Sequence, residues 1–279
     1  MNSIETFVKK KPTITVLLSV YNAESYVDIA IESILKQTFT DFELIAIDDC
    51  SVDKSWDIVQ QYAKLDNRVI AKRNKDNLGG CKTLNEGLKL AKGKYIARLD
   101  NDDWCYPDRL EKQFNFLEAH PDVGILGGVM EIMNQHGEVT AQRKYNTSDQ
   151  EIRNNIFRYS PFSHPLVMIR KSILDKVGFY NPIFAPADDY ELYFRIGEVS
   201  KFANLPDIIL RYRVISSSIT FMQTKKMELA TINVRNQYSK NPNYNFSCFD
   251  KIYNIFHFLS IYIIPSKLKI YIFNLLRNN

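Results

Sequence analysis

Short apolar runs alternate with amphipathic stretches over the first 120 residues of the chain. The run ITVLLSV (14–20) is apolar and partly β-branched, which is typical of a strand buried on both faces of a parallel sheet. In 27–35 the apolar positions repeat at i, i+3, i+4 and i+7, the stripe of an amphipathic helix. Further strands are predicted at 42–48, 68–72 and 94–99, with a helix before each of them.

This alternation predicts an α/β fold with a Rossmann-like, mostly parallel sheet flanked by helices. After residue 120 the pattern is less regular. It predicts strands at 123–133, 166–170 and 207–214, a helix at 188–199 and a polar stretch at 134–150. The sequence contains no internal repeat and no low-complexity linker. We therefore expect one domain over 1–220, with halves at 12–120 and 121–220, and a C-terminal helical appendage over 221–279.

Composition and charge exclude several classes of protein. With 279 residues, 45% hydrophobic and 24% charged, the chain has the make-up of a globular protein and not of a disordered tail, a collagen-like repeat or a polytopic membrane protein. The net charge is only +4, so we expect no nucleic-acid partner. Four cysteines without a CxxC pair and four scattered histidines fit no zinc cluster. Sparse cysteines, and a start without the apolar stretch of a signal peptide, predict a cytoplasmic protein with buried, unpaired thiols.

Acidic residues follow two of the predicted strands and open one predicted helix. They are Asp48–Asp49, Asp100–Asn101–Asp102–Asp103 and Asp188–Asp189. Ligands of doubly wound sheets bind beyond the carboxyl ends of the strands, so we expect these carboxylates to converge there. Their oxygens suit Mg²⁺ or Mn²⁺ together with a substrate phosphate. For 100–103 the alternative is a solvated turn that caps a helix beginning at Pro107.

Other nucleotide and nucleophile motifs are missing. NLGGCKT (77–83) has Cys81 where a phosphate loop requires glycine, no GxGxxG follows the first strand, and no GxSxG is present. SVYNAESY contains no glycine, which disfavours a sugar nucleotidylyltransferase. His164, alone in a constrained loop, is interpreted as a hydrogen-bonded loop histidine. Arg98 shares a strand face with Asp100, where we expect an ion pair.

The C-terminal segment 246–279 is rich in aromatic and aliphatic residues. Its run 252–264 has 13 residues, below the roughly 20 that span a bilayer, and Pro265 ends it. The basic residues of the segment stand against Asp250 alone; they are Lys251, Lys267, Lys269 and Arg277. We expect an interfacial helix in peripheral contact with a membrane, and the alternative is a helix packed on the domain or in a dimer interface.

Five segments together carry a resemblance to a known family. In chain order they are PTITVLLSVYN, SILKQTFTDFELIAIDDCSVDKS, NLGGCKTLNEGLKLAKGKYIARLDNDDWCYPDRL, SHPLVMIRKSIL and ADDYELYFRI. In order and spacing they closely resemble the family 2 inverting glycosyltransferases of the GT-A fold, over about residues 12–215. The resemblance implies that 12–120 bind a nucleotide-sugar and that 121–220 bind an acceptor.

For the donor, the resemblance implies a UDP-sugar. Ser19, Tyr21 and Asp49 would then hold the nucleobase, since an aromatic face can stack on uracil and a carboxylate can accept its imide N–H. Lys82 and Arg98 would lie near the donor, without a firm role.

The family's DxD motif falls on Asp100 and Asp102. The resemblance implies that Asp102 is the direct ligand of Mn²⁺ or Mg²⁺ and that Asp100 lies nearer the ribose or a metal-bound water. The ion would neutralise the charge that grows on departing UDP. Asp103 is expected to cap the following helix.

The family's catalytic base falls on Asp189, the second member of a pair that is usually Glu-Asp and is Asp-Asp here. Asp188 would orient the acceptor. Many relatives carry a histidine where this chain has Ile215. If that histidine helps to hold the diphosphate, its task passes to His164, Arg213 or the loop 215–222.

Together these observations predict a metal-dependent inverting glycosyltransferase that moves a hexose or N-acetylhexosamine from a UDP-sugar. The expected acceptor is a glycan or a polyprenyl-linked oligosaccharide in surface polysaccharide or lipopolysaccharide synthesis. The expected location is the cytoplasmic face of the inner membrane. The alternative is a non-catalytic scaffold that keeps the fold and binds nucleotide without turnover.

Overall fold

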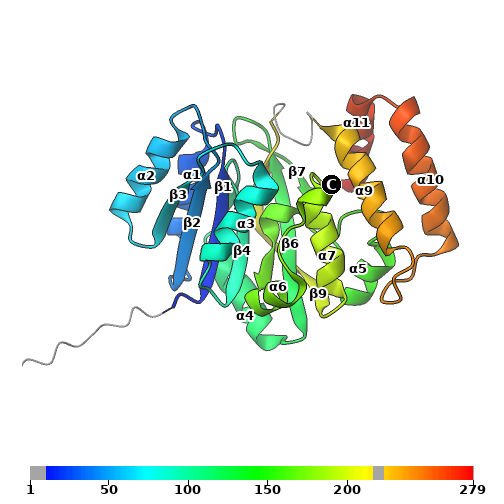
Figure 1. Ribbon diagram of the computed structural model, residues 1–279, viewed down its shortest axis with the longest axis horizontal. Coiled ribbons are helices and arrows are strands. Elements are labelled where there is room, and N and C mark those ends of the chain that lie inside the picture. The colour runs from blue at the N-terminus through cyan, green and yellow to red at the C-terminus, as the bar shows by residue number, and fades with distance from the viewer. Residues whose placement is uncertain (1–10, 216–222, 279) are drawn as a thin grey trace, which may run out of the picture.

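This computed structural model describes residues 11–215 and 223–278 of the chain. One mixed sheet of nine strands forms the centre of this described part, and helices lie on both faces (Figure 1). Its strand order is β3-β2-β1-β4-β8-β6-β9-β5, and β7 pairs with β6. The strands are β1 (Ile14–Val20), β2 (Phe42–Asp48), β3 (Val69–Arg73), β4 (Tyr95–Asp100), β5 (Trp104–Cys105), β6 (Val123–Met133), β7 (Val139–Arg143), β8 (Met168–Arg170) and β9 (Lys201–Arg213). The helices are α1 (Val27–Leu35), α2 (Ser55–Leu65), α3 (Gly80–Leu90), α4 (Arg109–Ala119), α5 (Asp149–Asn155), α6 (Lys171–Val177), α7 (Asp188–Gly197), α9 (Thr224–Tyr238), α10 (Cys248–Ile263) and α11 (Ser266–Arg277), with 3-10 turns η1 (His164–Leu166) and η2 (Pro182–Phe184).

Strands β1 to β4 form the predicted parallel half of the sheet. Ser19 in β1 lies opposite Ile47 of β2 and Asp100 of β4. The sequences that follow β2 and β4 therefore emerge on either side of the end of β1, since parallel strands end at one edge. Helices α1, α2 and α4 cover one face of the sheet, and α3, α5, α6, α7 and α9 cover the other. This double cover explains why β1 and β2 read as continuous apolar runs.

Two strands of the second half differ from the prediction. Strand β9 begins at Lys201 instead of 207 and pairs in parallel with β6, with register shifts on the β6 side between Gly127 and Val129. Pro206 falls in this irregular part. Because a proline within an apolar run argues against a strand, the sequence does not predict the first half of β9. Strand β7 lies within the stretch predicted as polar. Its ladder is with β6, apart from an isolated bridge between Arg143 and Asn278, and its side chains are partly or fully exposed, so no apolar run marks it.

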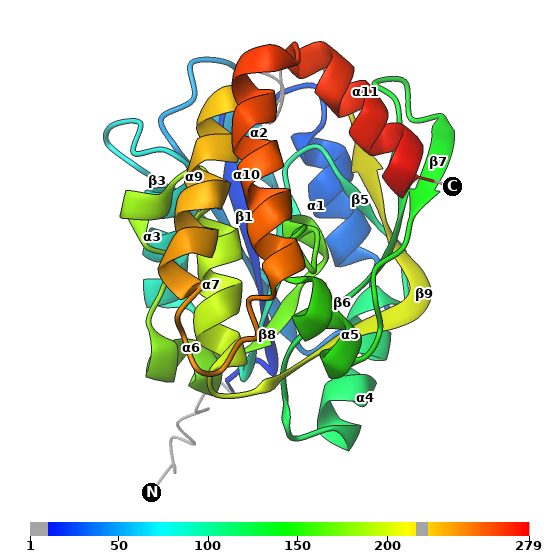
Figure 2. The ribbon, with the colours of Figure 1, turned by 90° about the vertical axis from the view of Figure 1, so that its right-hand side faces the viewer.

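The C-terminal helices pack on the rest of the molecule through α9. Tyr238 of α9 stacks on Phe194 of α7 with ring centroids 4.6 Å apart, and its hydroxyl donates to Oε1 of Glu191 at 2.9 Å. Helix α10 lies outside α9, and α11 returns toward β7 (Figures 1 and 2). Within 11–215 and 223–278, every helix is too short or too polar to cross a bilayer.

The cysteines are unpaired, as predicted. Cys105 is buried, Cys50 and Cys81 are half-buried, and Cys248 is exposed. The expectation of buried thiols is therefore wrong for Cys248, because this residue begins a helix that lies on the surface.

Arg235 ties α9 to its neighbours, and we expect its loss to destabilise the protein. This buried guanidinium donates to the carbonyl of Arg158 at 2.7 Å and to the hydroxyl of Tyr190 at 3.3 Å, and contacts Nδ1 of His257 at 2.9 Å. Arg235→Ala leaves these buried polar groups without their partner, so urea unfolding should give a loss of about 3 kcal/mol. The exposed control Lys251→Ala should change stability by less than about 0.5 kcal/mol. Equal stability of the two variants would contradict this assignment.

Candidate active site

Arg213 holds the acidic turn that follows β4. Its backbone N–H donates to Oδ1 of Asp103 at 2.8 Å, and its Nε donates to the carbonyl of Asp102 at 2.8 Å. The guanidinium also donates to two carbonyls of the β6–β7 turn and lies over the ring of Tyr26, 4.5 Å from its centroid. Arg213 is 5% exposed. The structure thus places this residue beneath the backbone of the turn.

Asp103 does not cap the next helix, contrary to the sequence prediction. Its side chain is fully buried, and Oδ2 has no hydrogen-bond partner within the described ranges. Helix α4 begins at Arg109 and is preceded by Asp108, so the turn capping a helix at Pro107 is also not found. Burial, with the charges of Asp102 and Asp100, raises the pKa of Asp103 well above its usual value. Asp103 is a buried anchor for Arg213.

Asp102 is half-buried, and its carboxylate lies close to that of Asp100. Burial, reinforced by the charge of Asp100, raises the pKa of Asp102 to about 7. Among the described residues, its only hydrogen-bond donor is its own backbone N–H. A divalent cation would favour the ionised form of this pair, and carboxylate oxygens are ligands that Mg²⁺ and Mn²⁺ accept.

The chain offers only part of a coordination sphere at this turn. Within 11–215 and 223–278, no group of three or more His, Cys, Asp or Glu side chains is arranged to hold a metal ion. Mg²⁺ often takes one or two carboxylates from the protein and the remaining oxygens from substrate phosphates and water. Asp100 and Asp102 fit an ion shared with a phosphate-bearing substrate, and they do not fit a closed structural metal site.

Arg98 supports Asp100 from inside the sheet. The side chain is 2% exposed, and its NH2 group donates to Oδ1 of Asp100 at 2.5 Å. NH1 donates to the carbonyls of Leu17 and Leu99 at 2.8 and 2.7 Å. The ion pair expected from strand alternation is confirmed. The guanidinium of Arg98 is therefore buried, and its charge is paired with the carboxylate of Asp100.

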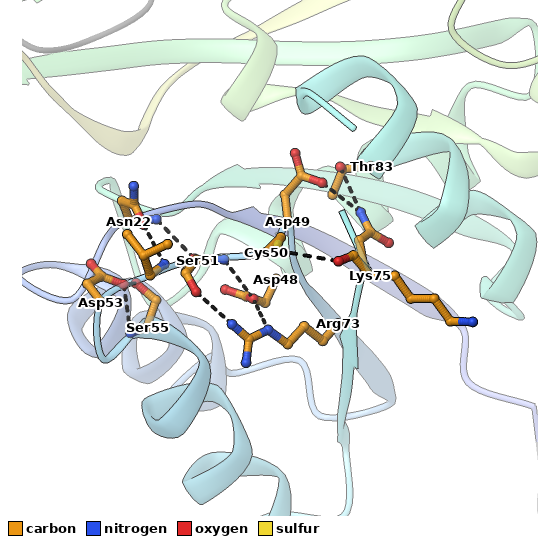
Figure 3. A network of polar contacts seen from close by, with 12 residues as sticks. Asn22, Asp48, Asp49, Cys50, Ser51, Asp53, Ser55, Arg73, Lys75 and Thr83 are labelled. Atoms are coloured by element: carbon orange, nitrogen blue, oxygen red, sulfur yellow. Dashed lines mark hydrogen bonds and ion pairs between the residues drawn. The ribbon is translucent and has the colours of Figure 1, made fainter. Parts of the chain in front are cut away.

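Asp49, which follows β2 and lies beside Asp48 in Figure 3, holds the loop that leads into α3. Its carboxylate accepts from Asn74 Nδ2 at 2.8 Å and from the backbone N–H groups of Leu78 and Gly79 at 2.9 and 2.8 Å. A carboxylate has about four acceptor positions, so one remains for a ligand. Asp48 points to the other side, where it accepts from Ser51 N–H at 3.1 Å and pairs with the guanidinium of Arg73 at 3.0 Å.

The remaining residues predicted for the donor lie around the same sheet edge. Tyr21, directly after β1, is 48% exposed, and its ring is available for stacking. Ser19 is partly buried, and its carbonyl accepts from Asn101 Nδ2 at 3.2 Å. Lys82 is exposed in the first turn of α3, which begins after Gly79 in a left-handed conformation.

Asp188 and Asp189 open α7 and face the acidic turn. Burial, the charge of Asp188 and a weaker contribution from Asp100 raise the pKa of Asp189 to about 7. Its hydrogen bonds come from its own backbone N–H and from Tyr190 N–H at 2.7 Å. Burial also raises the pKa of Asp188, while a hydrogen bond with the Cys81 thiol lowers it. The structure thus brings the carboxylate of Asp189 close enough to that of Asp100 for their charges to interact.

His164 and two residues that the sequence did not single out complete this region. His164 Nε2 lies 2.8 Å from the hydroxyl of Tyr180 and 3.4 Å from Nε of Arg98. Cys81, considered only as a misfit to the phosphate loop, contacts Asp188. No spacing pattern marks Tyr180, since it reaches the site only through tertiary folding. Ile215 is partly buried, and 216–222 of the predicted loop lie outside the described residues.

The mostly parallel sheet with flanking helices, and its acidic residues at the strand ends, is the architecture of the GT-A fold. The family model for glycosyl transferase family 2 matches residues 15–178, and the chain belongs to this family. An uncharacterized glycosyltransferase of Methanocaldococcus jannaschii is 31% identical over 240 residues, covering 84% of this chain and 82% of that protein. The O-antigen biosynthesis glycosyltransferase WbnJ of Escherichia coli is 33% identical over 250 residues, covering 84% of this chain and 93% of that one.

Solved structures share the fold at low sequence identity. S. aureus TarS superposes with a TM-score of 0.67 at 20% identity, covering 92% of this chain and 44% of that chain. TarS 1–349 in complex with UDP-GlcNAc gives 0.61 at 19% identity, with 89% and 81% covered. The mannosyltransferase PcManGT from Pyrobaculum calidifontis, in complex with GDP-Man and Mn²⁺, gives 0.62 at 15% identity, with 96% and 81% covered. These likenesses establish the fold alone.

Proposed function

We propose that this glycosyltransferase moves a hexose or N-acetylhexosamine from a UDP-sugar to a saccharide or lipid-linked oligosaccharide, with inversion, in surface polysaccharide synthesis. The observation that carries the proposal is Asp189, a buried carboxylate at the start of α7 that lies within reach of the charge of Asp100 and has a pKa of about 7. The O-antigen role in the name of WbnJ and the UDP-GlcNAc complex of TarS support the acceptor and donor classes.

In the proposed mechanism Asp189 is the general base. A base with a pKa near the working pH is ionised often enough to act and still takes a proton effectively. Asp189 would accept the proton of an acceptor hydroxyl as its oxygen attacks the anomeric carbon and the bond to UDP breaks on the opposite side. One displacement inverts the configuration, so an α-linked donor gives a β-linked product.

The acidic turn would hold the diphosphate end of the donor. A Mn²⁺ or Mg²⁺ ion bound by Asp102, with Asp100, would supply positive charge beside the diphosphate. Tyr21 and Asp49 would hold the base, and Asp188 would orient the acceptor. Mn²⁺ in the PcManGT complex supports a divalent ion for this chain.

UDP release from a panel of donors tests the proposed function. Wild-type protein is incubated with UDP-glucose, UDP-galactose, their N-acetyl forms and GDP-mannose, with Mn²⁺, Mg²⁺ or EDTA, and a parallel titration measures UDP binding. Metal-dependent release of UDP from one donor is the expected result. Release of GDP alone would overturn the donor class. UDP binding without any turnover, with or without candidate acceptors, would favour the scaffold alternative.

We also propose that α10 and α11 contact the cytoplasmic face of an anionic membrane. Both helices expose large apolar side chains, with exposed fractions of 67% for Phe256, 75% for Ile263 and 68% for Leu275. Helix α10 lies on the outside of the molecule (Figure 2). Basic residues dominate the segment, and apolar burial with attraction to anionic lipid is the chemistry of an interfacial helix.

Placing charges on this apolar face should abolish vesicle binding. The triple variant Phe256→Glu, Ile263→Glu, Leu275→Glu is expected to stay folded, because all three side chains are exposed, and to lose cosedimentation with phosphatidylglycerol–phosphatidylethanolamine vesicles. Val52→Glu, 87% exposed next to β2, is the matched control and should bind as the wild type does. Vesicle binding by the triple variant would refute the membrane contact. A concentration-dependent dimer that the triple variant loses would assign the face to a second copy.

A further inference from the structure

We propose that His164 is a positioning residue that, with Tyr180, fixes the guanidinium of Arg98 and through it the orientation of Asp100. This inference rests on the proposed function, because it assigns Asp100 to the donor and metal site. It adds two side chains that touch neither donor nor acceptor.

The hydrogen-bond chain has one possible direction at Arg98. A guanidinium can only donate, so Nε of Arg98 donates to Nε2 of His164 at 3.4 Å and that nitrogen carries no proton. The hydroxyl of Tyr180, 2.8 Å from the same nitrogen, is therefore also a donor. His164 is a neutral imidazole with its proton on Nδ1, and its Nε2 is the shared acceptor of both neighbours.

The electrostatics of the region keep His164 in this form. Burial, with the positive charge of Arg98 beside it, lowers the pKa of His164 well below its usual value. Burial raises the pKa of Tyr180, so its hydroxyl stays protonated and remains a donor. The same protonation states let Tyr180, at the shorter distance, and Arg98, at the longer one, both donate to Nε2.

The guanidinium of Arg98 donates hydrogen bonds in three directions, and only one of them leads to the carboxylate of Asp100. NH1 is fixed by two backbone carbonyls of β1 and β4, NH2 meets Oδ1 of Asp100, and Nε depends on His164. Without His164, the Nε–H group would be buried with no acceptor, which favours rotation of the whole guanidinium. Asp100 is 35% exposed at its side chain, so a carboxylate oriented by Arg98 remains accessible to a ligand.

Tyr180 is itself fixed by the helix that carries Lys82. The side chain of Asn85 in α3 accepts from Tyr180 N–H at 3.0 Å and donates to its carbonyl at 2.8 Å. Tyr180 also precedes η2 and α7, the helix that begins with Asp188 and Asp189. The chain Asn85–Tyr180–His164–Arg98–Asp100 therefore links α3, the approach to α7 and the end of β4.

Three variants at His164 separate positioning from packing. His164→Leu removes the acceptor and should weaken binding of UDP in the presence of Mn²⁺, with a matching fall in kcat/KM, by about 10- to 100-fold, as for other residues that orient a metal ligand. His164→Gln places a carbonyl oxygen near the position of Nε2 and should recover most of the loss. His120→Leu, exposed at the end of α4, is the control and should leave both quantities unchanged.

A double-mutant cycle with Asp100→Asn gives the decisive result. If His164 acts through Arg98 on Asp100, His164→Leu should have little further effect on Mn²⁺–UDP binding once Asp100 is replaced. A multiplicative loss in the double variant, or no rescue by His164→Gln, would overturn the positioning role. A wild-type protein that binds no UDP with either metal would instead refute the proposed function, so the two failures are distinguishable. Thermal unfolding of each variant checks that all of them are folded at the assay temperature.

Discussion

Replacing Asp189 by Asn is expected to lower the kcat of sugar transfer by about 10²- to 10⁴-fold, the usual contribution of a general base. The amide keeps the size of the side chain and can still accept hydrogen bonds, but it cannot take a proton from the acceptor. Binding of UDP should change little, because in the proposed mechanism Asp189 takes a proton from the acceptor and makes no contact with the nucleotide. Transfer assays with the donor identified by UDP release, together with a UDP titration, measure both quantities.

The raised pKa of Asp189 predicts the pH dependence of the wild type. Only the ionised carboxylate accepts a proton, so kcat/KM should rise with pH through about 7 and then level off. The Asn variant should lack this rise. Asp57→Asn, an exposed position on α2, is the matched control and should follow the wild-type profile. A wild-type profile that is flat from pH 5 to 9, or an Asn variant with normal turnover, would exclude Asp189 as the base.

The same shift has a consequence for stability. The folded protein holds the proton of Asp189 more tightly than the unfolded chain, since the pKa rises from 3.8 to about 7 on folding. This carboxylate therefore costs stability progressively as the pH rises from about 4 to about 7, by at most about 4 kcal/mol at 1.4 kcal/mol per unit. Asp189→Asn should unfold at a higher temperature than the wild type at pH 8 and show little difference at pH 4.

The second large effect is expected from Asp102→Ala. This change removes the carboxylate best suited to bind the ion, so metal-dependent UDP binding and UDP release should both fall by at least about 10²-fold. Without metal, the variant and the wild type should bind UDP about equally. Asp108→Ala, an exposed residue paired with Lys112 before α4, is the control and should behave as the wild type does.

Two results would contradict this prediction. The first is normal Mn²⁺ or Mg²⁺ dependence in Asp102→Ala, which would place the ion elsewhere. The second is full activity of the wild type in EDTA, which would show that the reaction needs no divalent ion and that the acidic turn does not bind one.

The first half of the fold could be predicted closely from the sequence. The predicted strands 14–20 and 42–48 coincide with β1 and β2, because a strand buried on both faces needs an uninterrupted apolar run. The same logic failed for β7, an edge strand, and for the part of β9 before Pro206, where a bulge accommodates the proline. Local pattern is informative where burial is continuous and weak at edges and irregularities.

The candidate site divides in the same way. Asp100, Asp102 and Asp189 could be named because acidic residues at element ends stand out in the sequence and match a family pattern. The position of Arg213 under the turn, the burial of Asp103 and the contacts of Tyr180 could not, because each depends on residues tens of positions away. Membership of glycosyltransferase family 2 was confirmed by the family match.

The sequence by itself determined the parallel strand–helix pattern, the acidic residues at the strand ends and the apolar character of 246–279, since each is a property of neighbouring residues. The tertiary structure alone decided which carboxylates repel one another and which accept hydrogen bonds from neighbouring loops. Asp49 accepts three hydrogen bonds from the loop before α3 and its support, while Asp102 and Asp189 accept only from backbone N–H groups of their own turn or helix start and have pKa values of about 7. The physical reason is that desolvation and charge–charge repulsion depend on distance in space, which only the folded chain defines.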